Sequence, residues 1–453
     1  MIDHRLFYSV LLSLTLIGTR PSHATSDRPN IILIMADDLG YECITANGGQ
    51  SYQTPVLDRL ATAGMRFEHC HSQPLCTPTR VQLMTGRYNV RNYLNFGTLP
   101  RTETTFAHTL KQAGYATAIC GKWQLGKEPD APQHFGFDEA FLWQHTRRPP
   151  RYANPGLELN AQERDYTQGE YGPTLINDFA LDFITRHQAK PFLLYYPMIL
   201  THDPFQPTPD SPNWDPKTTE ENKLKDKRHF AHMVAYMDKM IGRLDSKLEA
   251  LGIRENTVLI FLGDNGTHPS ITSRFKGQNY QGGKGSTTAS GTHVPLIIHW
   301  PKAVRPGSLN QDLISTADFF PTLCDLAGVS PPEQLDGISF APQLRGEAAM
   351  PRQWLYSWYS PRQKADLKVR EYAFDHRYKL YRDGSFFDLQ RDPSEQSALD
   401  LSAAASEDQT KAAAKLQSVL DEYRSARPAE LDEAFTKSLP NGNEAKKKKT
   451  TIR

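Results

Sequence analysis

The stretch NIILIMADD at residues 30–38 decides the fold class, and TVLIFLGDN at residues 257–265 repeats its pattern. Each begins with a continuous, mostly apolar run, Asn30–Ala36 in the first and Thr257–Gly263 in the second. Such a run is typical of a strand buried on both faces of a parallel sheet. Each run passes directly into acidic and amide side chains: Asp37, Asp38, Asp264 and Asn265. Ligands of α/β sheets bind beyond the carboxyl ends of the strands. The two stretches therefore predict parallel strands that carry polar groups to one edge of a sheet.

Two further predicted strands end in the same way, and helical patterns lie between the strands. Phe192–Leu200 leads into His202, and Tyr115–Cys120 leads into Lys122. The helices are expected over Thr54–Ala63, Thr105–Ala113, Pro173–Arg186 and Lys227–Leu251. Strands that alternate with helices predict an α/β fold with a doubly wound, mostly parallel sheet flanked by helices.

A different pattern begins near residue 346. Short, alternating, aromatic-rich runs predict a small antiparallel sheet over Trp354–Ser357, Val369–Phe374, Tyr378–Tyr381 and Ser385–Leu389. An amphipathic helix is expected to follow over Ala403–Arg424. We therefore divide the chain into a signal peptide (1–24), a catalytic domain (25–345), a smaller C-terminal α+β subdomain (346–430) and a polar tail (431–453) expected to be disordered.

The N-terminus predicts where the protein acts. Arg5 precedes an apolar run over residues 6–18, and small residues precede a cleavage site near Ala24, which is the layout of a secretory signal peptide. A membrane anchor is disfavoured because a span needs roughly 18–20 apolar residues. We expect an exported protein, periplasmic or secreted, with no membrane span after cleavage. The net charge of +1 argues against a nucleic-acid partner.

The chain has five cysteines, an odd number that is too small for a disulfide scaffold. One or two disulfides are possible among Cys43, Cys70, Cys120 and Cys324, and the spacing of these cysteines does not choose among the pairings. His69 and His71 flank Cys70 and would face the same side of a strand, but two histidines make a weak metal site. We assign these two histidines a structural role.

The four residues at the strand ends, Asp37, Asp38, Asp264 and Asn265, offer only oxygen ligands. Carboxylates and a carboxamide without His or Cys select a hard cation. We expect Ca²⁺ in preference to Mg²⁺, because flexible, higher coordination accepts ligands from two separate strand ends. The alternative is that these residues cap helices. The equivalent positions of the two pairs favour the metal.

Cys76 opens a predicted helix in the sequence CTPTR, residues 76–80. Pro78 suits the first turn, and a helix N-terminus presents free N–H groups to an anion. A cysteine at that place is expected to be activated or modified. The alternative is a buried structural thiol, which Arg80 and the nearby acidic pairs disfavour.

The CTPTR stretch, followed by LMTGR at residues 83–87, resembles the C-x-P-x-R motif of the type I, formylglycine-dependent sulfatases, a family of the alkaline-phosphatase superfamily. Further matches to the family occur in order between residue 29 and about residue 340, and weakly at Tyr378-Lys379-Leu380. They are ADDLG (36–40), GKWQLG (121–126), GDNG (263–266), GGKG (282–285) and Val294-Pro295.

The resemblance implies a mechanism for these positions. A maturation enzyme oxidises Cys76 to formylglycine, whose hydrated aldehyde lies beside Ca²⁺. The metal ligands would be Asp37, Asp38, Asp264, Asn265 and the modified Cys76. One hydroxyl attacks sulfur, with Asp264 as proton acceptor, and the second hydroxyl later expels sulfate. Arg80 would hold the diol, Lys122 and Lys284 would neutralise sulfate oxygens, and His202 with Lys284 would protonate the leaving oxygen.

One position departs from the family pattern. The family usually reads G-K-W-H-L-G, and this chain has Gln124 in place of the His. A carboxamide forms hydrogen bonds but does not titrate, so Gln124 either only positions the diol or leaves the second step to another base; low activity is the third alternative. His268 and Arg274 follow the second acidic pair and are weaker candidates for the substrate pocket.

The resulting prediction is a hydrolase, an arylsulfatase-like sulfuric ester hydrolase acting on a sulfated sugar or polysaccharide. Two alternatives remain. One is a phosphonate monoester or phosphodiester hydrolase, because relatives in the superfamily share the fold and some share C-x-P-x-R. The other is an inactive carbohydrate-binding relative, which Gln124 allows.

Overall fold

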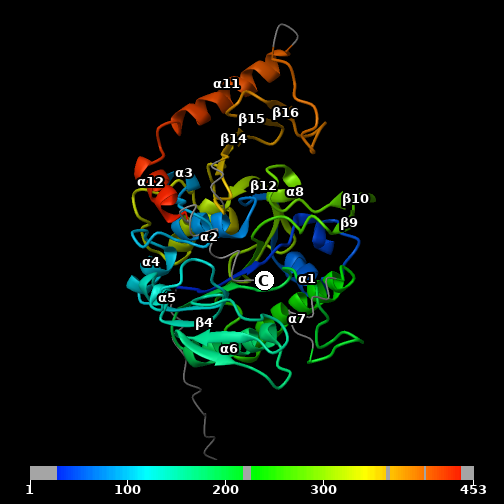
Figure 1. Ribbon diagram of the computed structural model, residues 1–453, viewed down its shortest axis with the longest axis vertical. Coiled ribbons are helices and arrows are strands. Elements are labelled where there is room, and N and C mark those ends of the chain that lie inside the picture. Colours follow the sequence, from blue (N-terminus) through cyan, green and yellow to red (C-terminus); the bar gives the residue numbers. More distant parts are fainter. Residues whose placement is uncertain (1–27, 218–225, 364–367, 402–404, 440–453) are drawn as a thin grey trace, which may run out of the picture.

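The computed structural model describes residues 28–217, 226–363, 368–401 and 405–439. Its centre is a mixed, mostly parallel sheet in the order β12-β2-β11-β8-β1-β7-β3-β4-β5-β6 (Figure 1). The strands are β1 Asn30–Ala36, β2 Met65–His71, β3 Ala116–Lys122, β4 Glu139–Trp143, β5 Gly156–Leu159, β6 Gln162–Asp165, β7 Phe192–Pro197, β8 Thr257–Gly263, β11 His293–His299 and β12 Ser308–Ser315. The predicted fold class is confirmed.

The two stretches that decided the fold lie side by side. β1 pairs in parallel with β8 from Asn30↔Thr257 to Ala36↔Gly263, and on its other edge with β7. Both strands are fully buried, as their apolar runs predicted. Their carboxyl ends therefore meet at one edge of the sheet.

Helices cover both faces of the sheet, and alternate residues of β1 point to each. Ile31 and Leu33 pack into one core, and Ile32 and Ile34 into the other. The first core contains residues of α2, α4 and α9, and the second contains residues of α1, α6 and α7. The helices are α1 Pro55–Ala63, α2 Cys76–Thr85, α3 Asn89–Asn92, α4 Phe106–Gln112, α5 Ala131–His134, α6 Gly172–His187, α7 His229–Ala250, α8 Ala289–Thr292, α9 Phe319–Leu326 and α10 Ala341–Arg345.

The C-terminal region forms the predicted antiparallel sheet, at the top of Figure 1. Its strands are β13 Leu355–Tyr359, β14 Arg370–Phe374, β15 Tyr378–Tyr381 and β16 Phe386–Asp388, and helix α11 Glu407–Glu422 packs on it. Leu380, Phe386 and Leu416 belong to the same apolar core as α2, so the small sheet is joined to the main body. A separate hairpin, β9 Thr272–Phe275 and β10 Gln278–Gln281, lies outside both sheets.

One expectation is wrong, one open question is answered, and one prediction falls outside the described residues. Helix α12 Ala429–Ser438 occupies the start of the expected disordered tail, because Phe435 is buried there. All five cysteines are free and buried, so no disulfide forms: Cys70 and Cys324 pack in one core, and Cys43 and Cys120 in the other. The predicted signal peptide lies outside the described residues. Within the described chain, no helix has the length and apolar character needed to cross a membrane.

Candidate active site

The loops and element ends at the carboxyl edge of the main sheet bring the predicted residues together. Asp38, which follows β1, has a left-handed φ of 61° and accepts a hydrogen bond from Asn265 Nδ2 at 2.9 Å. The backbone N–H of Asp38 donates to Asp264 Oδ1 at 3.0 Å. The loops after β1 and β8 are thereby locked together, and Asp37, Asp38, Asp264 and Asn265 are all fully buried.

Helix α2 presents the nucleophile candidate to this edge. Cys76 is the first residue of α2, and its Sγ lies 2.9 Å from Gln124 Oε1. Ligand atoms of Asp37, Cys76 and Asp264 all lie within 4.8 Å of one another. Arg80, one turn further along α2, is fully buried and donates to Asp264 Oδ2 at 3.0 Å. The helix therefore carries a sulfur atom and a guanidinium to the acidic cluster.

Two lysines and a histidine complete the centre. Lys122, the last residue of β3, donates to both oxygens of Asp37 at 2.8 Å. Lys284 donates to Asp38 Oδ2 at 2.6 Å and lies 3.1 Å from His202 Nε2. The other ring nitrogen of His202 lies 3.0 Å from Asp203 Oδ1, which orients the imidazole. The sequence analysis did not identify Asp203; its signal was its position next to a strand-end histidine.

The charges of the centre shift one another's protonation. Burial raises the pKa of Asp37, but Lys122, His202 and Arg80 outweigh it and hold that pKa well below its usual range. Burial and the charge of Asp37 together raise the pKa of Asp264 to about 7. Burial also raises the pKa of the Cys76 thiol. Three carboxylates, Asp37, Asp38 and Asp264, thus share one buried site with the cations of Arg80, Lys122 and Lys284.

The donor set fits a hard divalent cation. Asn265 Oδ1 is buried and has no hydrogen-bond partner in the part of the chain that the structure describes. The carboxylates of Asp37 and Asp38 are each neutralised by a lysine ammonium. A buried amide oxygen without a partner, next to three carboxylates, is a set of oxygen ligands that Ca²⁺ or Mg²⁺ would satisfy.

The three weaker candidates for the substrate pocket, Gln124, His268 and Arg274, have different surroundings. Gln124 contacts Cys76 and has a left-handed φ of 56°. His268 is half-buried, its ring packs on Phe205, and its pKa is lowered by burial, with the charge of nearby Asp203 opposing the shift. Arg274 is not at the centre: it lies exposed on β9 and donates within its own hairpin, to Asn279 Oδ1 at 3.0 Å and to the Gly277 carbonyl. Arg274 contacts none of the residues of the centre within the described chain, and its role in the substrate pocket stays a prediction.

The loop that carries Lys284 is braced by the small sheet. Lys379, fully enclosed on β15, donates to the carbonyl of Thr287 and to Glu395 Oε1 at 2.8 Å. The hydroxyls of Tyr381 and Thr287 lie 2.8 Å apart. The residue after Lys284, Gly285, donates its N–H to the carbonyl of Pro74, close to Cys76. The sequence analysis had no role for these bracing residues, since their partners lie nearly a hundred positions away.

Comparisons with known proteins agree with this geometry. Residues 29–329 match the family model described as Sulfatase, and residues 287–425 match the one described as N-sulphoglucosamine sulphohydrolase, C-terminal. Arylsulfatase A of Bos taurus is 32% identical over 77% of this chain and 74% of its own length. N-acetylglucosamine-6-O-sulfatase of Bacteroides thetaiotaomicron is 25% identical over 92% and 90%. The crystal structure of Ps i-CgsB superposes with a TM-score of 0.74 at 26% identity, over 88% of this chain and 94% of that one.

Proposed function

Since the chain belongs to the sulfatase family and is a sulfatase, we propose that it removes sulfate from a sulfated carbohydrate by way of a formylglycine formed at Cys76 and a bound Ca²⁺. The observation that carries the proposal is the cluster of Asp37, Cys76 and Asp264, whose ligand atoms lie within 4.8 Å of one another. The carbohydrate class follows from relatives such as the N-acetylglucosamine-6-O-sulfatase.

The modification accounts for the surroundings of Cys76. Converted to formylglycine by a maturation enzyme, the residue supplies a hydrated aldehyde, of which one hydroxyl attacks sulfur and the other expels sulfate. A Cys76 thiol of raised pKa would be a poor nucleophile in this buried place. Arg80 holds the nucleophile's position, because its guanidinium is fixed between Asp264 and the carbonyl of Lys122.

The metal would be held by Asp37, Asp38, Asp264 and Asn265, together with the modified Cys76. When bound, it supplies positive charge that polarises a sulfate oxygen and the nucleophile. Asp264, whose carboxylate lies within 4.8 Å of Cys76 Sγ, is the candidate to accept the proton of the attacking hydroxyl. Mg²⁺ is the second choice of ion.

The remaining residues act on the sulfate and the leaving group. Lys122 and Lys284 offer ammonium groups that neutralise sulfate oxygens. The Nε2 atom of His202 lies 3.1 Å from Lys284 Nζ, and its Nδ1 atom lies 3.0 Å from Asp203 Oδ1. His202 is therefore the candidate to donate a proton to the leaving oxygen. Gln124 holds the reactive side chain through its carboxamide and exchanges no proton. His268 contributes to the pocket wall.

The location of the enzyme follows from its N-terminus. We propose that residues 1–24 direct export and that the mature enzyme acts outside the cytoplasm, in the periplasm or the medium. All five cysteines are nevertheless free and buried, so the fold does not depend on disulfides for its stability.

The test compares ester classes on protein produced together with a formylglycine-generating enzyme. We expect hydrolysis of 4-nitrophenyl sulfate to exceed that of the matching phosphate monoester, phosphodiester and phosphonate monoester. Mass spectrometry of the Cys76 peptide should show the aldehyde in place of the thiol. A clear preference for phosphorus esters would reassign the enzyme to the phosphonate or phosphodiester hydrolases, and no hydrolysis of any ester by the modified protein would favour a carbohydrate-binding role.

A further inference from the structure

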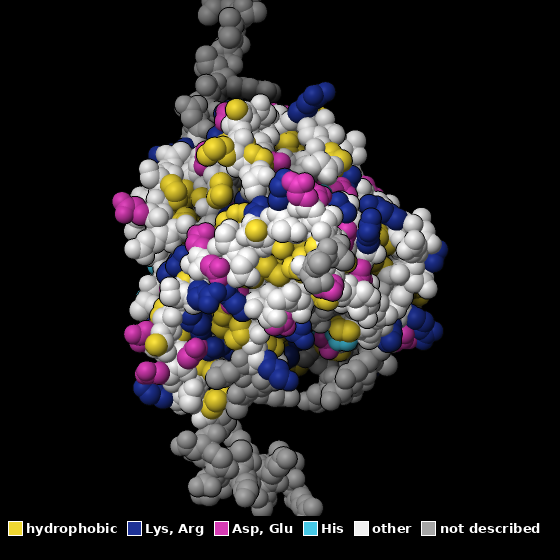
Figure 2. All heavy atoms as spheres, turned by 90° about the horizontal axis from the view of Figure 1, so that it is seen from above, with side chains coloured by type: hydrophobic (Ala, Val, Ile, Leu, Met, Phe, Trp, Pro, Cys, Tyr) yellow, Lys and Arg dark blue, Asp and Glu magenta, His cyan; other side chains and the backbone are white. Residues whose placement is uncertain are grey.

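A cavity of about 340 Å³ with basic walls lies between the Lys284 loop and the small sheet. It is lined by Gly285, Tyr359 and Pro361 and by three basic residues, Arg362, Lys368 and Arg370. No acidic side chain lines it within the described ranges. The chain as a whole is almost neutral, and Figure 2 shows basic and acidic side chains intermingled on the face it presents. A local excess of positive charge in one cavity therefore indicates an anionic ligand.

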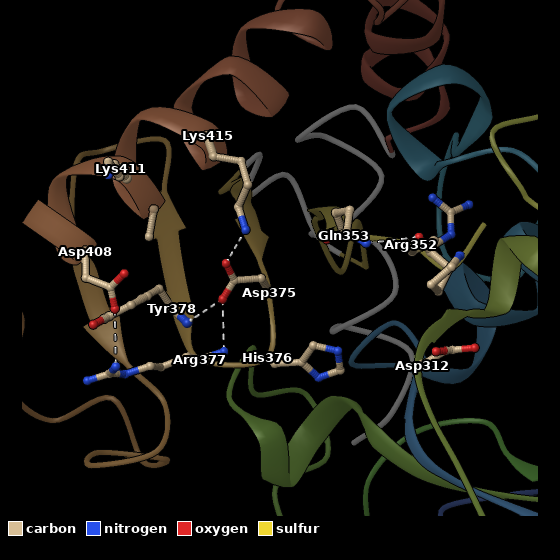
Figure 3. Close-up of a pocket in the computed structure, with 12 residues that line it drawn as sticks. Asp312, Arg352, Gln353, Asp375, His376, Arg377, Tyr378, Asp408, Lys411 and Lys415 are labelled. Atoms are coloured by element: carbon tan, nitrogen blue, oxygen red, sulfur yellow. Dashed lines mark hydrogen bonds and ion pairs between the residues drawn. The ribbon is translucent and has the colours of Figure 1, made fainter. Parts of the chain in front are cut away.

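A second cavity, shown in Figure 3, provides the contrast. Its volume is about 450 Å³, and it too is rich in basic residues. Each of these has a carboxylate partner: Lys415 bonds to Asp375, Arg377 to Asp388 and Asp408, Lys411 to Glu407, and Arg352 to Asp318. The positive charges of these lysines and arginines are thus compensated by carboxylates of the protein, so this cavity has no excess positive charge for a ligand.

The basic cavity adjoins the active centre. Gly285, in its wall, directly follows Lys284. Tyr359 lies in the field of both the centre and the cavity: burial and the charge of Cys76 raise its pKa, whereas Lys284 and Arg370 lower it. Gly285 also donates its N–H to the carbonyl of Pro74, two residues before Cys76, so the cavity borders the centre on the side where a bound molecule would continue toward Arg370.

Arg370 is the residue that the fold leaves available. It begins β14 opposite Tyr359 of β13, and its guanidinium forms no hydrogen bond or ion pair with any described residue. Arg362, in contrast, donates to Asp432 at 2.5 Å. Arg370 also lines a neighbouring cavity of about 320 Å³, which it shares with Thr287, Tyr381 and Asp383. The charge of Arg370 helps to lower the pKa of the exposed Asp383 carboxyl, but the two side chains form no ion pair.

We propose that Arg370 binds a second anionic group of the substrate, a sulfate or a carboxylate, while the sulfate to be removed occupies the centre at Cys76. This inference rests on the proposed sulfatase function and specifies its substrate as a carbohydrate with at least two negative charges. The planar guanidinium matches both oxyanions by bidentate hydrogen bonds. Tyr359 and Pro361 offer apolar surfaces on which a sugar ring packs between the two anions.

The test measures binding, so that it does not depend on turnover. Matched pairs of hexosamine and hexose sulfates, monosulfated and disulfated, are titrated by calorimetry into protein carrying Cys76→Ala. A uronate-containing monosulfated disaccharide and its neutral counterpart form a third pair, which separates carboxylate from sulfate. At least one pair should favour the doubly charged member by roughly 10-fold or more, the value of one charge-assisted bidentate contact. Adding Arg370→Ala should remove that preference, and Arg370→Lys should restore part of it.

The control is Arg391→Ala, an exposed arginine of the same subdomain that lines none of the cavities described above. It should leave the preference unchanged. The subsite is disproved if no pair shows a preference, or if the preference survives Arg370→Ala. Hydrolysis of 4-nitrophenyl sulfate by the protein with Cys76 intact tests the proposed function separately. Charge-dependent binding without hydrolysis would contradict the function and retain the subsite.

Discussion

Two regions of the molecule bury charged side chains, and they do so differently. At the carboxyl edge of the main sheet, three carboxylates lie among Arg80, Lys122 and Lys284. In the small sheet, Lys379 is buried against Glu395, among the rings of Tyr372 and Tyr381. Both regions pay a desolvation cost for their charges.

The two regions differ in whether their buried polar groups all have partners. The groups around Lys379 satisfy one another: its ammonium donates to Glu395 and Thr287, and Tyr381 donates to the second oxygen of Glu395. The active centre leaves Asn265 Oδ1 without a partner among the described residues and raises the pKa of Asp264 to about 7. A closed network stabilises structure, whereas an open one is suited to a ligand.

The strongest test of this distinction is Cys76→Ala. It should abolish hydrolysis of aryl sulfate, with a loss of at least about 10⁴-fold in kcat, because the reacting group is removed. Cys70→Ala, at a buried thiol in the apolar core, is the matched control and should affect stability alone. Full hydrolysis by the Cys76 variant would contradict the proposed mechanism.

Metal removal tests whether the open network awaits a cation. Treatment with a chelator should lower kcat/KM by roughly 10²–10³-fold, and Ca²⁺ should restore it better than Mg²⁺. Asn265→Ala should weaken Ca²⁺ binding in calorimetry. Asn177→Ala, at another buried asparagine whose Oδ1 has no partner within the described chain, should leave the affinity unchanged. Equal affinity in the two variants would remove Asn265 from the ligand set.

Lys379→Met tests the closed network. The free energy of unfolding should fall by about 3 kcal/mol or more, because Glu395 stays buried without its cation. Activity should fall as well, since the Lys284 loop loses its hydrogen bond at Thr287. Chemical denaturation and aryl sulfate kinetics measure the two effects. Lys379→Arg should retain more activity than Lys379→Met. Equal kinetics in the two variants would show that Lys379 contributes to stability alone.

The boundary between the two regions should be sensitive to acid. His293 of β11 stacks on Tyr41 at 4.0 Å and contacts His71, and burial lowers its pKa to about 4. The unfolded chain takes up this proton near pH 6.5 and the folded chain near pH 4, so stability falls as the pH drops through that window. The loss should approach about 3 kcal/mol. Chemical denaturation at several pH values should show that the free energy of unfolding depends less steeply on pH in His293→Gln than in the parent protein. An unchanged dependence would show that His293 is not the source of the acid sensitivity.

The smallest expected effect is at Gln124. Gln124→His places a titrating group where the carboxamide now contacts Cys76. We expect kcat for aryl sulfate to rise by roughly 10-fold or less, and its pH profile to gain a limb near the pKa of histidine. If the pH profile of Gln124→His is identical to that of the enzyme with Gln124, position 124 takes no part in proton transfer.

Much of the fold was predictable from local patterns. The buried strands β1 and β8 were predicted with the bounds they have, because an apolar run bounded by polar residues is a local signal. The strand-end residues could be grouped because parallel strands end at a common edge. The C-terminal helix α12 was missed, since its apolar content is confined largely to Phe435, whose burial depends on distant partners.

The sequence by itself determined the fold class and the residue types of the centre, because hydrophobic periodicity and short motifs are written in consecutive positions. Only the tertiary structure decided which side chains meet. It paired His202 with Asp203 and Lys284, tied Arg274 to its own hairpin, and left four of the five cysteines unpaired in the two apolar cores. It also left Arg370 without a partner among the described residues beside a basic cavity. Such contacts join residues far apart in the chain, and their distances follow from packing, which no local pattern encodes.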